Sequence, residues 1–267
     1  MREDWRVPAL VEPAFEQVMQ FCAREPVERV FLEEMALRAI GRFVGLDAGD
    51  GTLQALCHAG ANLVPSGVGC AAFADAAVRS SSRMIIGEER AVDELWGAAG
   101  ALMPIPREDR PGQPVYRTLV APPPGNTGLR AAALDDLERL LPACAAAHEL
   151  ELGIDPRGRD EEGFRWRVRS QIEDGRSWLW LEDDVILFKA EASAWTPSAV
   201  QVQQVWVDPE ARGRGYAKRG LADLIRLLLD STPIVTLFVR TDNLPAIRLY
   251  DSLGMERVLS YRSILFP

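Results

Sequence analysis

Histidine, lysine and cysteine are scarce in this 267-residue sequence, and each scarcity excludes a class of site. Histidine occurs only at His58 and His148, so a histidine-rich metal centre is excluded and we expect no metal. The 4 cysteines lack the short paired spacing of zinc sites, and nothing in their positions supports a disulfide framework. Lysine occurs only at Lys189 and Lys218, whereas the other basic residues are arginine.

Long apolar runs and an excess of positive charge are also missing. No stretch approaches the roughly 18 uncharged apolar residues that span a bilayer. The segment Met1–Arg6 is too polar and too acidic for a secretory signal. The formal net charge of −9 at pH 7 repels nucleic acid and anionic lipid. We therefore expect a cytoplasmic protein without a nucleic-acid or membrane partner.

The composition that is present describes a globular protein with a full core. Hydrophobic residues make up 48% of the chain and charged residues 26%. The length suits one large domain or two of ordinary size. Pro122, Pro123 and Pro124 supply no backbone donors and favour a stiff, extended connection. We therefore expect two domains, over residues 1–126 and 127–267.

The spacing of apolar residues predicts alternating helices and strands. Expected helices lie at residues 11–23, 27–40, 71–78, 88–99, 135–150, 164–173, 217–230 and 244–253. Expected strands lie at 53–57, 63–64, 84–86, 115–120, 129–131, 178–181, 185–192, 201–207, 234–239 and 257–265. This order predicts an α/β or α+β fold, with a mixed central sheet and helices on both of its faces.

One stretch joins a strand, a glycine-bearing turn and the start of an amphipathic helix. The strand ends at Val205, Trp206 and Val207, and the turn and helix start comprise Arg212, Gly213, Arg214, Gly215, Tyr216, Ala217 and Lys218. Unpaired amides and the helix dipole make such a helix start an anion site. The two glycines let a pyrophosphate approach the backbone, and the three basic side chains add positive charge.

Other phosphate motifs do not fit this turn. The sequence contains no G-x-x-x-x-G-K-[ST], and Lys218 stands where a G-x-G-x-x-G motif needs its last glycine. The pattern that fits is [QR]-x-x-G-x-[GA], with Arg212, Gly215 and Ala217 at its defined positions. We therefore expect the turn to bind a phosphate ligand other than those of the P-loop and dinucleotide folds.

A second motif follows further along the chain. A strand leads into N-x-x-A-x-x-x-Y-x-x-x-G, with Asn243, Ala246, Tyr250 and Gly254 at the defined positions. Asn243 suits a helix N-cap. Together with the first turn, this motif resembles the GNAT superfamily of N-acyltransferases over roughly residues 127–267. Met255 stands where that family usually has phenylalanine, and both side chains are apolar.

The resemblance implies an acyltransferase in which an amine attacks the thioester of acetyl-CoA, or of another acyl-CoA, directly. It implies that residues 212–218 bind the pyrophosphate and that Asn243 borders the pantetheine arm. The amides of Val205–Val207 would bind the pantetheine and the thioester carbonyl. Tyr250 would be the general acid that protonates the leaving thiolate, and the alternative for it is a core aromatic residue.

The general base is less clear from the residues. Several relatives carry a glutamate on the strand equivalent to residues 201–207, but Gln203 and Gln204 occupy it here, and amides cannot accept the proton. Glu191 is our candidate for this catalytic role, and the alternative is an ordinary solvated carboxylate on a strand. The acceptor is expected to be a small-molecule or protein amine, and a homodimer is an open option.

The first half resembles an actinobacterial-type family in which an uncharacterised domain with the stretch Gly60–Pro65 precedes a GNAT domain. Its strand, loop and helix around Met84–Glu89 echo the second half, which suggests two GNAT-like halves in tandem. Glu88 and Glu89 would repel a pyrophosphate there, so we expect one coenzyme A site. The alternative to an enzyme is a non-catalytic acyl-CoA-binding or sensing protein.

Overall fold

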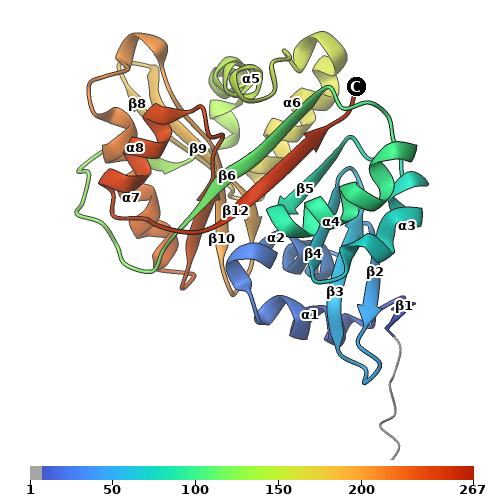
Figure 1. Ribbon diagram of the computed structural model, residues 1–267. Helices are drawn as coiled ribbons and strands as arrows, with labels where there is room; N and C mark the ends of the chain where they lie inside the picture. The colour runs from blue at the N-terminus through green and yellow to red at the C-terminus, as the bar shows by residue number, and fades with distance from the viewer. Residues whose placement is uncertain (1–7) are drawn as a thin grey trace, which may run out of the picture. The chain divides into compact units, whose positions relative to one another are not determined.

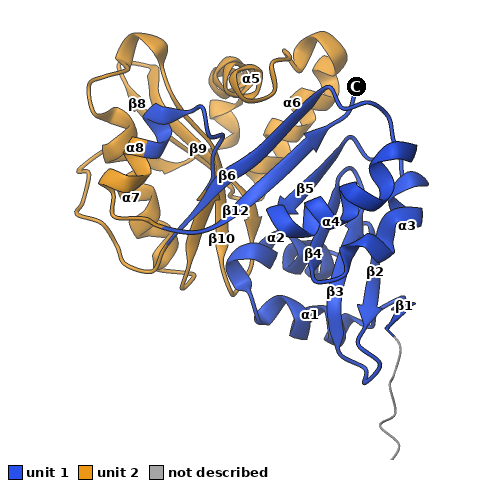
Figure 2. Cartoon of the chain, viewed as in Figure 1, with its two compact units in different colours: residues 1–117, 238–247, 257–267 blue, residues 118–237, 248–256 orange. Residues whose placement is uncertain are grey.

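The computed structural model describes residues 8–267 (Figure 1). The segment Met1–Arg6, used above to argue against a secretory signal, lies outside the described residues. The chain forms two compact units (Figure 2). Unit 1 comprises Met1–Arg117, Phe238–Ile247 and Arg257–Pro267, and unit 2 comprises Thr118–Leu237 and Arg248–Glu256. This division differs from the expected one at residue 126, because two segments near the C-terminus return to unit 1.

Among the described residues, unit 1 contains seven strands and the helices that pack on them. Its elements are β1 (Ala9–Val11), α1 (Phe15–Ala23), α2 (Pro26–Leu37), β2 (Arg42–Asp47), β3 (Leu53–Ala59), β4 (Leu63–Gly67), η1 (Cys70–Phe73), α3 (Ala74–Val78), β5 (Met84–Glu88), α4 (Glu89–Ala99), η2 (Gly100–Leu102), β6 (Glu108–Thr118) and β12 (Glu256–Leu265). The strands follow the order β1-β2-β3-β4-β5-β12-β6. The last strand, β12, pairs antiparallel with β5, from Tyr261 opposite Glu88 to Leu265 opposite Met84.

Unit 2 contains a second set of five strands. Its elements are β7 (Arg130–Ala131), η3 (Leu134–Asp136), α5 (Leu137–Leu152), α6 (Arg157–Glu173), β8 (Ser177–Glu182), β9 (Val185–Trp195), β10 (Val200–Val207), η4 (Pro209–Ala211), α7 (Tyr216–Leu229) and β11 (Val235–Phe238). The helix α8 (Leu244–Ser252) begins in unit 1 and ends in unit 2. The strands follow the order β11-β10-β9-β8-β7, and only β10 and β11 run parallel within this set.

Helices cover both faces of the unit 2 strands. Neighbouring residues of β9 point to opposite faces, so Phe188 and Lys189 identify the helix on each face. On one face Gly220 of α7 lies against Phe188, where an added Cβ would come within 2.5 Å of the ring. On the other face Lys189 meets Cys144 of α5, beside an apolar core shared by α5, α6 and the sheet. Apolar cores also occur among the described residues of unit 1, one containing Phe21 of α1 and another containing Phe73 of η1.

The two halves of the chain repeat one order of elements. Each half runs through a strand, two helices, three strands, a helix, a strand, a helix and a final strand. The first pass ends with β6 and the second with β12. In this order the segment from β4 into η1 and α3 corresponds to the segment from β10 into α7. The repeat supports the expected tandem architecture.

Two strands of the first half were missed by the sequence analysis. Val11 was expected in a helix but belongs to β1, and α1 begins only at Phe15. Pro13 explains the difference, because the residue before a proline is disfavoured in helical conformation. The strand β2 was also missed, since it lies between the helix expected at residues 27–40 and the strand expected at 53–57, where no element was predicted. Within residues 8–267, no helix has the length and apolar character needed to cross a membrane.

Candidate functional site

The loop between β10 and α7 has the backbone geometry of an anion-binding turn. It starts with the short turn Pro209–Ala211, which Asp208 caps by accepting a hydrogen bond from the Glu210 amide at 2.8 Å. Gly213 has φ 78° and Gly215 has φ 85°, both in the left-handed region that favours glycine. Gly215 is the N-cap of α7 and has no side chain to satisfy the amides that follow it.

These amides are available to a ligand. The first amides of an α-helix have no acceptor within the helix. Among the described residues, the structure records no acceptor for the amides of residues 216–218. A Cβ added to Gly213 or Gly215 would meet nothing within 4 Å, so the loop is open. The side chains of Arg212, Arg214 and Lys218 are exposed around it. The loop can therefore accept a diphosphate by amide donation and by charge.

The strand that leads into this loop departs from its neighbour β11. The recorded ladder between β10 and β11 joins Val200 to Val235 and Gln201 to Thr236. The ladder with β9 continues much further, to Val207 opposite Phe188. Residues 205–207 thus lie beyond the recorded β11 ladder, while their other edge is held by β9. An edge of this kind offers backbone groups to a ligand.

The helix α8 positions the other two candidate residues. Asn243 precedes α8 and accepts a hydrogen bond from the Ala246 amide through its Oδ1 at 3.2 Å, the capping geometry that the sequence suggested. Tyr250 lies near the end of α8 and is 5% exposed. Its carbonyl accepts hydrogen bonds from the amides of Leu253 and Met255. This burial is compatible with both roles considered for Tyr250.

The candidate base, Glu191, is held inside unit 2 by two cations. Its side chain is 1% exposed, 2.7 Å from Lys189 Nζ and 3.1 Å from Arg167 Nη1. Burial alone would raise the pKa of Glu191, but Lys189 and Arg167 outweigh it and lower the pKa to about 2. A base must accept a proton near neutral pH and reach the substrate. The surroundings of Glu191 favour a structural ion pair instead.

The corresponding loop of unit 1 has a similar backbone but is already filled. Gly67 has φ 95° and Gly69 has φ 89°. Glu94 of α4 accepts hydrogen bonds from the amides of Gly69 and Cys70 at 2.7 and 2.8 Å through one carboxylate oxygen. A carboxylate of the chain itself thus occupies the position that an anion would take.

This correspondence corrects the sequence analysis, which compared the second half with Met84–Glu89. That segment is the turn from β5 into α4, one step further along the repeated order. Glu88 acts there as the N-cap of α4, accepting a hydrogen bond from the Ala91 amide at 3.0 Å. The element that matches the glycine turn of the second half is instead the turn after β4.

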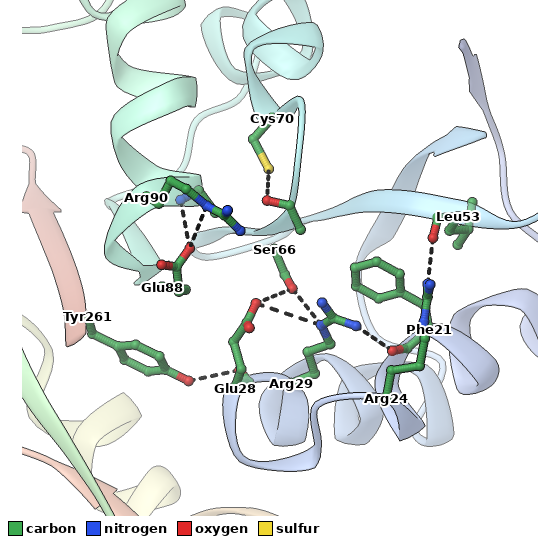
Figure 3. Close-up of polar contacts among 12 residues, drawn as sticks. Phe21, Arg24, Glu28, Arg29, Leu53, Ser66, Cys70, Glu88, Arg90 and Tyr261 are labelled. Carbon is green, nitrogen blue, oxygen red and sulfur yellow. Dashed lines mark hydrogen bonds and ion pairs between the residues drawn. The ribbon is translucent and has the colours of Figure 1, made fainter. Parts of the chain in front are cut away.

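Figure 3 shows the polar groups beside β4 in unit 1. Ser66 donates a hydrogen bond to Glu28 at 2.5 Å and accepts one from Arg29 Nε at 2.9 Å. Tyr261 of β12 donates to the Glu28 carbonyl at 2.8 Å. These contacts join α2, β4 and β12 inside unit 1. No cluster of three or more metal-binding side chains occurs among residues 8–267.

Two family models match the chain. Residues 134–255 match the model described as "Acetyltransferase (GNAT) family", and residues 41–140 match "Domain of unknown function (DUF4081)". Several solved structures are similar over almost the whole chain, among them two GNAT proteins. An acetyltransferase from the GNAT family from Colwellia psychrerythraea has a TM-score of 0.59 and 12% identity, covering 98% of this chain and 100% of its own. A tandem GNAT protein from the clavulanic acid biosynthesis pathway has a TM-score of 0.54 and 14% identity, covering 97% and 98%.

These structural similarities confirm the predicted fold class, and identities this low establish the fold alone. N-alpha-acetyltransferase RimI of Mycobacterium tuberculosis is 44% identical over 64 residues, which is 23% of this chain and 38% of that protein. The chain spans 17% and 38% of the lengths of the two curated relatives that it matches.

Proposed function

We propose that this chain, whose C-terminal part is a GNAT acetyltransferase domain preceded by a DUF4081 region, transfers an acetyl group from acetyl-CoA to an amine. The observation that carries the proposal is the open loop of residues 212–218, with its unpaired amides and exposed basic side chains. It follows directly on a strand edge that lies beyond the β11 ladder. This combination fits a ligand with a pyrophosphate and an extended arm.

In this proposal the amides of residues 216–218 and the glycine turn bind the pyrophosphate of acetyl-CoA. The backbone of Val205–Val207 binds the arm and polarises the thioester carbonyl, and Asn243 borders the arm. The acceptor nitrogen forms a bond to the carbonyl carbon, and the carbon–sulfur bond breaks. Tyr250 donates a proton to the leaving thiolate.

We assign no proton-accepting role to Glu191. Its burial and its two cationic partners keep it charged and away from solvent. The proton of the acceptor ammonium therefore leaves through water or through another group. The name of the Mycobacterium tuberculosis relative makes the α-amino group of a peptide the acceptor to test first.

We also propose that unit 1 binds no second acetyl-CoA. Glu94 already satisfies the amides of Gly69 and Cys70, so a pyrophosphate would have to displace a carboxylate of the chain. The expected stoichiometry is one acetyl-CoA per chain. A titration calorimetry experiment that finds two equivalent sites would contradict this part of the proposal.

A second candidate function is binding of acyl-CoA without catalysis. It is favoured by Gln203 and Gln204 on the strand where the resemblance to the GNAT superfamily would place a glutamate, together with the ion-paired state of Glu191. The two functions differ in turnover. Thiol release from acetyl-CoA should be measured over a panel of peptide and small-molecule amines, with Tyr250→Phe as the matched variant. Tight binding of acetyl-CoA without thiol release from any amine would favour the binding protein.

A further inference from the structure

An irregularity of β10 lies directly before the proposed thioester-binding segment. Gln203 stands opposite Glu191 of β9, and the next recorded pair joins Trp206 to Lys189. Between these pairs β10 advances by three residues and β9 by two, so β10 contains one extra residue, a β-bulge. Gln204 within it has φ 51°, a left-handed conformation that a glutamine adopts only at an energetic cost.

The bulge decides how the rest of the strand is presented. Because side chains alternate along a strand, one inserted residue turns every later residue to the opposite face. Trp206 is thereby placed in the core beneath α5 and α6, 8% exposed, whereas Val205 and Val207 are half-buried. The same insertion shifts the backbone amides from one strand edge to the other. The bulge therefore determines which amides of residues 205–207 face the edge away from β9.

A fully buried lysine holds this bulge. Lys189 is 0% exposed, and its Nζ lies 3.2 Å from Gln204 Oε1, 2.7 Å from Glu191 Oε1 and 3.0 Å from Cys144 Sγ. An ammonium group has three hydrogens to donate, and three acceptors are present. Burial by itself lowers the pKa of Lys189, but Glu191 outweighs it and raises the pKa above its usual value, so the cation persists.

The charged pair is in turn fixed to the helices on that face. Glu191 accepts a hydrogen bond from Arg167 of α6 and one from the thiol of Cys144 of α5. The amide oxygen of Gln204 is therefore tied through Lys189 to a network that spans α5, α6 and β9. Such a network fixes a geometry, because a buried ammonium cannot give up one acceptor without a replacement.

We infer that Lys189 and Gln204 are positioning residues for the acyl donor: their hydrogen bond holds the β-bulge that aims the amides of Val205–Val207 at the thioester of acetyl-CoA. This inference rests on the proposed function. In the proposed reaction, the side chains of Lys189 and Gln204 do not touch the reacting atoms. The backbone conformation of Gln204 sets the direction of the amides that follow it. Lys189 fixes this conformation through its hydrogen bond to the Gln204 side chain.

Gln204→Ala tests the inference with little risk to the fold, since Gln204 is half-buried. The variant should bind acetyl-CoA about tenfold more weakly, which corresponds to about 1.4 kcal/mol. Its affinity for the nucleotide fragment of coenzyme A, which keeps the pyrophosphate but lacks the pantetheine arm and thioester, should stay unchanged. A general loss of structure would weaken both ligands together, so the ratio of the two affinities isolates positioning.

Gln201→Ala is the matched control. Gln201 lies on the same strand and also bonds a side chain of β9, Ser193 Oγ, at 2.8 Å, but it precedes the bulge at Gln204 and lies beside a separate irregularity between Gln201 and Val202. This variant should keep the affinity ratio of the unmodified chain. Equal effects of Gln201→Ala and Gln204→Ala would overturn the inference.

Gln204→Gly separates the hydrogen bond from the backbone conformation. Glycine adopts a positive φ without the cost that glutamine incurs, but it cannot bond Lys189. We expect it to weaken acetyl-CoA binding as Gln204→Ala does, with a smaller drop in melting temperature. Wild-type affinity in this variant would show that the side-chain link is unnecessary and would refute the role of Lys189.

The double variant Lys189→Met/Glu191→Gln removes the two fully buried charges together, and Arg167, the other partner of Glu191, keeps 32% of its side chain exposed to solvent. It should reproduce the selective loss of acetyl-CoA affinity. If the unmodified chain does not bind acetyl-CoA at all, the proposed function fails. If the unmodified chain binds it and every variant keeps its affinity ratio, only the present inference fails.

Discussion

The loop after β4 and the loop after β10 stand at the same place in the repeated order of elements, yet their amides have different partners. In unit 1, Glu94 accepts hydrogen bonds from the amides of Gly69 and Cys70. In unit 2, no acceptor is recorded for the amides of residues 216–218 among the described residues, and Arg212, Arg214 and Lys218 are exposed around them. The same turn can thus brace a fold or bind a ligand, depending on whether the chain supplies its own anion.

The comparison extends to the buried ion pairs that support the two strands. Ser66 of β4 rests on Glu28 and Arg29, as Figure 3 shows. In unit 2, β10 rests on the pair of Lys189 and Glu191. In unit 1 the ion pair accompanies a loop that is already filled, and in unit 2 it accompanies an open loop. Both units thus have an ion pair beside the strand, and they differ in whether the amides of the following loop have an acceptor.

The largest expected effect concerns acid stability and the pair in unit 2. Burial raises the pKa of Glu191, but the attraction of Lys189 and Arg167 outweighs burial. The pKa is therefore lowered from 4.5 to about 2. Its contribution to the free energy of unfolding is complete above about pH 4.5 and is lost as the pH falls towards 2. The contribution is on the order of 3 kcal/mol. Lys189, Arg167, His148 and the Cys144 thiol interact with Glu191, and the raised pKa of Lys189 keeps that ammonium charged throughout this range.

Chemical denaturation at pH 7 and pH 3 measures this contribution. The Glu191→Gln variant should be less stable than the unmodified chain at pH 7, and the difference should shrink at pH 3. A matched control is Glu173→Gln, since Glu173 forms an exposed pair with Arg169 at 2.8 Å and such pairs contribute little. A constant difference between pH 7 and pH 3 would contradict the assignment.

The next prediction tests the open loop itself. Gly215→Val places a β-branched residue at φ 85°, and the strain of such a position costs about 1–3 kcal/mol. We expect acetyl-CoA to bind about 30-fold more weakly, because the loop relaxes away from the geometry that presents its amides. Isothermal titration calorimetry measures the change.

Gly153→Val is the control for this substitution. Gly153 also has a positive φ, 70°, lies in open space and ends α5 in the same unit. It should lower stability by a similar amount and leave acetyl-CoA affinity intact. If the two variants weaken binding equally, the loop after β10 is not the pyrophosphate site.

Much of the fold and of the loop was predictable because the signals are local. The helix expected at residues 217–230 is observed as α7, since an amphipathic run is bounded by Gly215 and by Pro233. The alternation of apolar residues likewise identified most strands. By contrast, no local pattern indicates that β12 pairs with β5, because these strands lie far apart in the chain.

The site contains two features that alternation and motifs could not give. Gln204 interrupts a strand whose sequence reads as regular, so the bulge and its consequence for Trp206 were missed. Glu94 reaches the Gly69 turn from another helix, and its sequence position gives no indication of that contact. One usable signal was present: a lysine in the middle of an apolar strand, in a chain with only two lysines, is a candidate for a specific buried role.

A third prediction concerns the filled loop. Glu94→Ala leaves the amides of Gly69 and Cys70 without their acceptor, and we expect unit 1 to lose about 1–2 kcal/mol of stability. Acetyl-CoA should still bind with a stoichiometry of one. Glu16→Ala, on the exposed side of α1, provides a control that changes charge equally. A second acetyl-CoA site in Glu94→Ala would show that the Glu94 carboxylate alone keeps acetyl-CoA from binding at the loop after β4.

The smallest expected effect concerns charge around the open loop. Arg214 is exposed, so its attraction to a pyrophosphate is screened by solvent and salt. Arg214→Gln should weaken acetyl-CoA binding about threefold at low ionic strength, and the difference should fade as salt is added. Arg79→Gln, at the exposed residue that follows α3 in unit 1, removes the same charge from elsewhere and should have no effect. An equal loss in both variants would mean that the overall charge of the chain attracts the ligand, whereas a loss confined to Arg214→Gln would place the attraction at the loop.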